Sequence, residues 1–318
     1  MTWRELYERA AASAVPASGH YHDNVRVEGP DGPVIVRIPI RDAETMDLRL
    51  WPEEEVLRSI APHVPEAPRL LFASGEFQVH SFVPGDLLDD LAPFGTSVPA
   101  HVPGDVARLF GTLARIPQDK LPTVPPGWPT DGDTSGFALR LSGWTRHLYE
   151  SFREQHSALF ARLGIPDDPL AALDERLLGL TPRPFGCLHA DMHRANLIVR
   201  QGESAFLDWE LALWGDPVYE LAVHLRRTGY PPRDRAAMLE RWLAEMPRTH
   251  TEGWEDDLRV HLVHEHIKAA MVMTVRALGV PRAPFERLTA SVNAAREFWG
   301  VPGPLFPGEV RRLLTSGG

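Results

Sequence analysis

Two short apolar runs, each closed by polar residues, constrain the fold of this chain more than any other feature. They lie in CLHADMHRANLIV (187–199) and SAFLDWELALWGDP (204–217), and Gly202 turns the chain between them. The pattern predicts two hairpin-linked segments whose polar residues stand where each apolar run stops. We therefore expect these polar side chains to converge on one edge.

The polar residues follow the pattern H-x-D-x-x-x-x-N, formed by His189, Asp191 and Asn196, and Asp208 ends the second run. Such a group suits phosphoryl transfer, in which the protein positions the reactants and neutralises negative charge. Asp191 is the candidate acceptor of the proton from an attacking hydroxyl. Asn196 and Asp208 offer the oxygen ligands that Mg²⁺ prefers.

The N-terminal part of the chain predicts a small antiparallel sheet with one helix. After an amphipathic helix in residues 1–15, alternating β-branched runs flank the turn residues 29–33. Residues 51–64 have Pro and three Glu at a helix start, followed by an apolar face. Residues 69–75 and 76–85 then give two further short strands.

From Asp86 onward the spacing of apolar residues becomes helical, notably in residues 101–116 and 137–164. Between these two helices, residues 117–136 are rich in Pro, Gly and Asp and predict a long surface connection. The fold class is therefore α+β.

These motifs resemble the aminoglycoside phosphotransferase and choline kinase family, which has a protein-kinase-like fold of two lobes. The stretch LDWELALWGDPVYELA is similar to the family's metal segment, although Glu220 stands where the family usually has aspartate. The resemblance implies an N-terminal nucleotide-binding lobe in residues 1–83, and a mainly helical lobe in residues 84–318 that carries the catalytic loop and the substrate site.

By the same resemblance, VIVRIPI carries the phosphate-binding basic residue, here Arg37 in place of the usual lysine. Arginine can pair with phosphates and with a helix glutamate, but its planar fork is not equivalent to an ammonium group. Glu53 is the preferred helix partner, and Glu54 and Glu55 remain alternatives.

The stretch FQVHSFVPGDLL resembles the hinge that binds the nucleotide base, and ASGHYHDN takes the place of the glycine-rich loop with a single glycine. The resemblance assigns the base-binding groups to positions near His80, Ser81, Phe82 and Val83.

Three residues of the catalytic loop are interpreted as its support. His189 is expected to brace the backbone of the loop. His193 and Arg194 could reach a transferred phosphate or form a solvated surface pair. Cys187 is expected to be a small buried residue.

Two polar groups lie further along the chain. The acidic run at Glu252, Glu255, Asp256 and Asp257 predicts an exposed helix start. The cluster of His261, His264, Glu265 and His266 has helical spacing, and it predicts a substrate-facing or merely polar face.

The favoured function is a small-molecule O-phosphotransferase that moves the γ-phosphate of ATP or GTP to a hydroxyl group with Mg²⁺. The resemblance suggests inactivation of an aminoglycoside, macrolide or nucleoside antibiotic, as a resistance enzyme. A metabolite kinase of the choline or homoserine kinase type and a nucleotide-binding pseudokinase are alternatives. A hydrolase with zinc on His189, Asp191 and His193 is a further alternative, which leaves Asn196 and LDWE unexplained.

Composition limits the partners. The formal charge of −10 argues against binding of nucleic acid or of an anionic membrane. A single cysteine excludes an intramolecular disulfide. With no apolar signal region at the N-terminus and no bilayer-length apolar run, we expect a cytoplasmic protein that acts on a small molecule with a free hydroxyl.

Overall fold

The computed structural model describes residues 1–13, 17–18, 21–40, 46–280 and 283–315. The chain forms two compact units, each assembled from three separate segments. Unit 1 comprises residues 1–125, 186–214 and 230–246, and unit 2 comprises residues 126–185, 215–229 and 247–318. The predicted lobe boundary between residues 83 and 84 stays a prediction.

Unit 1 contains the predicted N-terminal antiparallel sheet, in the strand order β1-β2-β3-β5-β4. Its strands are β1 (Ala17–Ser18), β2 (His22–Gly29), β3 (Gly32–Pro39), β4 (Leu70–Ala73) and β5 (Gln78–Ser81). In β2 and β3 the paired residues Val25 and Val36 lie on the buried face, as the alternation of the sequence predicts. The prediction of a small antiparallel sheet is thus confirmed.

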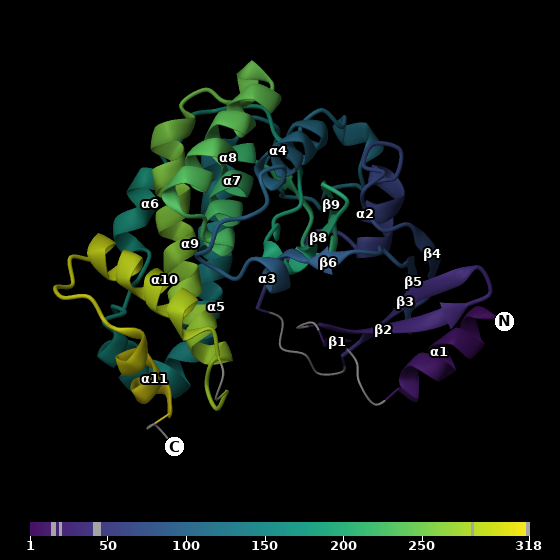
Figure 1. Cartoon of the computed structure of the whole chain (residues 1–318). Coiled ribbons are helices and arrows are strands. Elements are labelled where there is room, and N and C mark those ends of the chain that lie inside the picture. Colours follow the sequence, from purple (N-terminus) through teal and green to yellow (C-terminus); the bar gives the residue numbers. More distant parts are fainter. Residues whose placement is uncertain (14–16, 19–20, 41–45, 281–282, 316–318) are drawn as a thin grey trace. The chain divides into compact units, whose positions relative to one another are not determined.

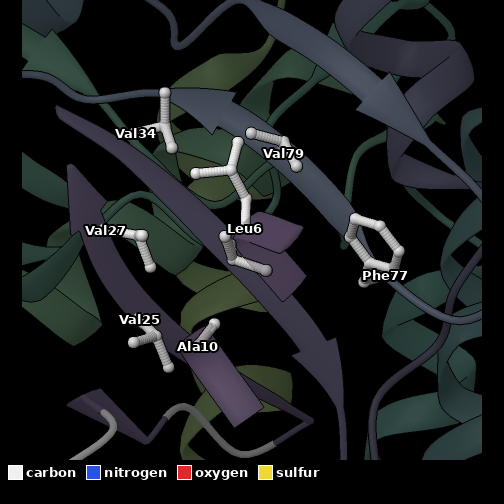
Figure 2. Packing of buried hydrophobic residues seen from close by; sticks show 8 residues of the cluster. Leu6, Ala10, Val25, Val27, Val34, Phe77 and Val79 are labelled. Carbon is white, nitrogen blue, oxygen red and sulfur yellow. The ribbon is translucent and has the colours of Figure 1, made fainter. Parts of the chain in front are cut away.

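Helix α1 (Trp3–Ala11) covers one face of this sheet. Figure 2 shows Leu6 and Ala10 of the helix against Val25, Val27 and Val79 of the strands. Thr2 caps the helix, because its hydroxyl accepts from Glu5 N while the Glu5 carboxylate accepts from Thr2 N. The amphipathic pattern of the N-terminus therefore provides the cover for the sheet.

Helix α2 (Glu53–Ile60) is the predicted helix between β3 and β4. Pro52 precedes its first turn, and three glutamates lie in that turn, where the helix dipole favours negative charge. Val56, Leu57 and Ile60 are buried. The apolar stripe thus fixes the orientation of the helix, which leaves Glu53 also buried and Glu55 exposed.

The rest of unit 1 contains a second sheet of three strands, in the order β6-β8-β9. The elements of this part of the unit are β6 (Asp86–Leu87), α3 (Leu88–Leu91), α4 (Val102–Leu113), η1 (Gln118–Lys120), β7 (Gly186–Leu188), η2 (Arg194–Asn196), β8 (Leu197–Arg200), β9 (Glu203–Phe206), β10 (Leu213–Gly215), whose last residue is assigned to unit 2, and α8 (Pro232–Glu245). Strands β8 and β9 form the predicted hairpin, with Arg200 paired to Glu203 and Gly202 in the turn at φ +84°. Cys187 is buried in β7, as predicted.

Unit 2 is helical. It contains α5 (Thr134–Leu163), α6 (Ala171–Leu177), α7 (Pro217–Thr228), η3 (Arg248–His250), α9 (Trp254–Arg276), α10 (Phe285–Phe298) and α11 (Pro307–Thr315). Helix α9 packs against both α7 and α10 (Figure 1). Helix α5 begins three residues before the predicted start, because Asp133 accepts a hydrogen bond from Gly136 N and caps the first turn.

The interior of unit 2 corrects two predictions from the sequence. Asp257 does not belong to an exposed acidic helix start: it is buried, and it accepts from Thr181 N and from Arg183. The helix face of His261 and Glu265 is not open to a substrate, because both side chains are buried; it is the merely polar face of the second alternative, and it lies in the interior.

Each of these buried groups has a partner inside unit 2. His261 Nε2 lies 3.0 Å from Asp216 Oδ2, and Glu265 accepts from the Tyr219 hydroxyl and the Arg226 guanidinium. The charge of Arg226 outweighs burial and lowers the pKa of Glu265 to about 2. The histidines and acids of α9 therefore cross-link the helices of this unit.

Among the described residues, no helix combines the length and the apolar character that spanning a membrane requires.

Candidate active site

The segment between β7 and β8 forms a tight loop in unit 1. Ala190 has a positive φ of +57°, a conformation that L-residues with a Cβ adopt at a cost. This twist turns the chain at the end of the buried strand and brings Asp191, which is 7% exposed, into the loop. The surrounding structure, and not local preference, holds this backbone.

Asp191 and Asn196 lie in direct contact. Asn196 Nδ2 donates to the backbone oxygen of Asp191 at 2.9 Å and to its Oδ2 at 3.1 Å. His193 Nε2 lies 3.5 Å from the same carboxylate oxygen. The Asp191 carboxylate is therefore held in one orientation by its own loop.

Asp208 follows β9 and lies at the same end of the hairpin as Asn196. Leu207 N donates to Asn196 O at 2.8 Å, which continues the ladder of β8 and β9 by one more bond. Asp208 itself has φ +64°, so that both polar segments contain a residue in the left-handed region. The predicted convergence of Asp191, Asn196 and Asp208 on one edge thus agrees with the local backbone geometry.

The donor atoms at this edge fit a hard cation such as Mg²⁺. Since Asn196 uses Nδ2 for Asp191, its Oδ1 keeps its lone pairs. Asp208 accepts from Arg37 through Oδ1 and is 28% exposed in its side chain, which leaves Oδ2 available. An amide oxygen and a carboxylate oxygen are the ligand types that Mg²⁺ prefers.

His189 supports both segments from beneath. It is fully buried, its Nε2 lies 2.9 Å from Leu207 O, and its Nδ1 accepts from Asp191 N at 3.3 Å. Its ring centroid lies 4.5 Å from that of Trp209, and burial lowers the pKa of His189 to about 4. Both ring nitrogens are engaged, which counts against the zinc hypothesis.

Arg194 is also buried in full. Its guanidinium donates to Ala92 O and, at 2.7 Å, to Thr96 O, in the segment after α3. The alternative of a solvated surface pair is therefore wrong for Arg194, because its charge is compensated by backbone carbonyls inside unit 1. These bonds tie the catalytic loop to residues 92–96.

Arg37, on β3, pairs with acidic residues of two other segments. Its Nε lies 3.3 Å from Glu53 Oε2, and its Nη2 lies 2.9 Å from Asp208 Oδ1. Burial lowers the pKa of Arg37, but the charges of Glu53, Asp208 and Glu210 outweigh it and raise the pKa above the ordinary value. The guanidinium is therefore a permanent cation at this point.

Glu53 occupies the position proposed for the helix partner, and its other carboxylate oxygen accepts from Trp209 N at 3.1 Å. Burial raises the pKa of Glu53, against the opposing charge of Arg37. Glu54 instead accepts from Gln78, and Glu55 is exposed. Of the three glutamates, the structure thus brings only Glu53 to Arg37.

Sequence reasoning missed three residues beside Arg37. Glu210 Oε2 lies 2.9 Å from Arg49 Nη2 and 3.0 Å from His22 Nδ1. Glu210 is the last residue of the Asp-Trp-Glu segment, so the motif includes it. His22 lies in the stretch ASGHYHDN, but no pattern singles it out, and nothing in the sequence marks Arg49, whose position depends on the pairing of distant segments.

The residues assigned to the hinge lie on β5 and directly after it. His80 is buried beside Gln78, and burial lowers its pKa to about 3. Ser81 Oγ accepts from Arg69 N, and the ring of Phe82 lies under the Arg26 guanidinium. Val83 follows in a half-buried position. The imidazole of His80 is thus neutral and lies within the sheet.

The stretch assigned to the glycine-rich loop, residues 17–24, falls partly outside the described residues, which omit residues 19–20.

A small antiparallel sheet and a mainly helical remainder are the architecture of the kinase-like fold class. A family model described as the phosphotransferase enzyme family matches residues 14–287. The chain belongs to this family, as the resemblance of its motifs predicts.

Solved structures of similar fold include enzymes with different substrates. A macrolide 2'-phosphotransferase from Brachybacterium faecium is 16% identical with a TM-score of 0.54, and the match covers 88% of this chain and 90% of the other. An ethanolamine kinase from Plasmodium vivax is 14% identical with a TM-score of 0.63, covering 90% and 85%. A choline kinase from Cryptosporidium parvum is 13% identical with a TM-score of 0.57, covering 89% and 88%.

At these identities the likeness establishes the fold alone. No curated protein matches the sequence.

Proposed function

We propose that the protein transfers the γ-phosphoryl group of ATP or GTP to a hydroxyl group of a small molecule, with Mg²⁺ as the metal. The observation that carries the proposal is the contact between Asp191 and Asn196 at the edge where Asp208 follows β9. Phosphoryl transfer requires a base and metal ligands close together, and this contact supports the assignment of those roles to Asp191, Asn196 and Asp208.

In the proposed reaction, the substrate oxygen forms a bond to the γ-phosphorus while the bond to the bridging oxygen of the nucleotide breaks. Asp191 accepts the hydroxyl proton, and Asn196 fixes the orientation of its carboxylate. Asn196 Oδ1 and Asp208 would hold Mg²⁺, which neutralises charge on the phosphates. Arg37 adds a fixed positive charge at the same edge.

The groups His189, His193 and Arg194 are assigned to support of the loop. His189 joins the Asp191 backbone to Leu207, and Arg194 anchors the loop to residues 92–96. The nucleotide base is assigned to the backbone near His80, Ser81 and Val83, by analogy with the family.

We further propose that the substrate is an antibiotic of the aminoglycoside, macrolide or nucleoside type and that its modification gives resistance. Similarity to a macrolide phosphotransferase supports this class. Similarity to ethanolamine and choline kinases supports the second candidate, phosphorylation of a small amino alcohol. The test must therefore include both classes.

The experiment is a mass-spectrometric screen of purified protein with Mg²⁺, ATP or GTP, and a panel of antibiotics and amino alcohols. A product heavier by one phosphoryl group identifies the donor and the substrate class together. Loss of the proton acceptor in Asp191→Asn should slow turnover by roughly 100-fold or more, and nucleotide binding should be retained. The control is Asp31→Asn in the exposed turn between β2 and β3.

Two results would contradict the proposal. Turnover by Asp191→Asn at the rate of the unchanged protein would remove Asp191 as the base. Nucleotide binding without any product across the panel would favour the pseudokinase hypothesis.

A further inference from the structure

Two arginines and a histidine lie around one oxygen of the Glu210 carboxylate. One oxygen, Oε2, lies 2.9 Å from Arg49 Nη2, 3.0 Å from His22 Nδ1 and 3.6 Å from Arg37 Nη2. The Glu210 side chain is 11% exposed, so water screens these interactions only weakly. Nitrogens of Arg49, His22 and Arg37 thus lie around one carboxylate oxygen, and they come from three separate segments of unit 1.

The same cluster contains Asp208, one of the two proposed metal ligands. Arg37 contacts Glu53, Asp208 and Glu210, so that three carboxylates face the two arginines Arg37 and Arg49. A divalent cation on the half-exposed Asp208 side chain would compete with the guanidinium for that carboxylate. The arginines would then face an excess of positive charge, which favours an incoming anion.

Arg49 is held in place on its other side. Its guanidinium lies over the ring of Tyr21 at 4.0 Å from the centroid. The Tyr21 hydroxyl donates to Asp47 at 2.8 Å and accepts from Met46 N at 3.2 Å, which fixes the ring. Arg49 is nevertheless 35% exposed, unlike Arg37 at 7%. It therefore combines a fixed position with an accessible guanidinium edge.

The guanidinium groups of Arg37 and Arg49 are suited to bind phosphate oxygens. Guanidinium forks bind phosphate and carboxylate in the same bidentate manner, so a carboxylate can occupy the place of a phosphate. His22 is the first residue of β2 and lies within the stretch that takes the place of the glycine-rich loop. It lies 3.4 Å from Arg37 Nη2.

We propose that Arg49 and His22 complete, with Arg37, a binding site for the terminal phosphates of the nucleotide, and that Glu210 holds these donors until the phosphates arrive. This inference rests on the proposed function and assigns phosphate contacts to side chains where the sequence has a single glycine. It adds two residues, from the start of β2 and from the segment before α2.

The test compares nucleotides that differ only in their phosphates. Calorimetric titration with Mg²⁺ uses ATP, ADP and adenosine, or GTP, GDP and guanosine if the unchanged protein prefers guanine. Arg49→Gln should weaken binding of the di- and triphosphates by about tenfold or more and leave nucleoside binding unchanged. His22→Asn should act in the same direction with a smaller effect, and Arg49→Lys should recover part of the affinity.

The control variant is Arg58→Gln, at an exposed position in the last turn of α2. It removes the same charge from the same unit without touching the cluster. It should leave all three affinities unchanged, which separates a local contact from the effect of net charge.

A second variant tests the holding role of Glu210. In EDTA, the unchanged protein should bind ADP weakly, because Arg49 and His22 remain paired with the carboxylate. Glu210→Gln removes that competitor and should tighten metal-free binding of ADP by about threefold or more, on the scale of a partly screened charge pair. A purely structural role of Glu210 predicts no gain.

The outcomes are distinguishable. If the unchanged protein binds the nucleotide but Arg49→Gln binds ATP, ADP and nucleoside as tightly, this inference is wrong and the proposed function stands. Equal weakening for nucleoside and triphosphate would also refute it, since that result indicates a damaged fold. If the unchanged protein binds no nucleotide, the proposed function fails and the inference fails with it.

Discussion

Replacement of Asp216 by asparagine should destabilise unit 2 strongly. The Asp216 carboxylate is fully buried, lies 2.7 Å from Arg183 Nη1 and 3.0 Å from His261 Nε2, and also accepts from Val218 N at the start of α7. Asparagine retains an oxygen for the helix cap but loses the charge. Removing one partner of a buried ion pair costs about 3–5 kcal/mol, because the other charge stays buried.

The expected loss lies near the lower end of this range, at about 3 kcal/mol, since Arg183 keeps Asp257 and the Glu252 carbonyl as partners. That is a large part of the roughly 5–15 kcal/mol by which folded domains are stable. Urea unfolding followed by circular dichroism at pH 7 measures it. Asp256→Asn is the control on α9, where an exposed pair with Arg259 contributes at most about 1 kcal/mol.

The effect should also depend on pH. Burial alone would raise the pKa of Asp216, but the His261 hydrogen bond and the charges of His261 and Arg183 hold the pKa below its usual value. A carboxyl group with a lowered folded-state pKa stabilises above its unfolded pKa, about 3.9, and this contribution is lost as the pH falls through the folded value. The difference in the free energy of unfolding between the unchanged protein and Asp216→Asn should be constant from pH 7 to about 5 and become smaller below pH 4.

A difference in the free energy of unfolding below about 1 kcal/mol at pH 7 would refute this reasoning. It would mean that the cost of desolvating Asp216 and Arg183 cancels their attraction. A difference that stays constant down to pH 3 would show that Asp216 does not titrate differently in the folded and unfolded states.

Two further predictions concern unit 1. Gly85→Ala should lower the stability measured by thermal unfolding by about 2 kcal/mol more than Gly32→Ala does. Both glycines have positive φ, but only at Gly85 would a Cβ clash, at 2.5 Å from Ile198 Cγ2. Equal losses of stability would show that the strand can shift. Arg194→Met should cost about 2 kcal/mol, because it leaves the buried Ala92 carbonyl without its donor and also removes the bond to Thr96 O. It should increase proteolysis of residues 92–98, and unchanged protection there would contradict the anchoring role.

The sequence was sufficient for features that depend on neighbouring residues. Gly202 between two apolar runs predicted the hairpin of β8 and β9, and the segment ends predicted which edge Asn196 and Asp208 share. The alternation in β2 and β3 predicted the sheet that α1 covers. In each case the same short stretch supplies both the strand and its turn.

Features that join distant segments were missed. Arg49 and Glu210 are separated by 161 residues, and no local pattern marks either as a partner of the other. His261 and Glu265 read as a polar helix face, because the sequence does not show that Asp216 and Arg226 lie opposite them. Buried polar residues need partners, and pattern reasoning alone does not locate those partners.

The pairing of Arg37 with Asp208 has a consequence for synthesis of the chain, because 171 residues separate the two. At a translation rate of roughly 5–20 residues per second, Arg37 and Glu53 leave the ribosome on the order of ten seconds or more before Asp208 and Trp209 do. During that interval Arg37 and Glu53 have each other as partners, but Asp208 and Trp209 do not yet exist. The catalytic edge is therefore assembled late, and a nascent chain that ends before residue 208 has no such edge.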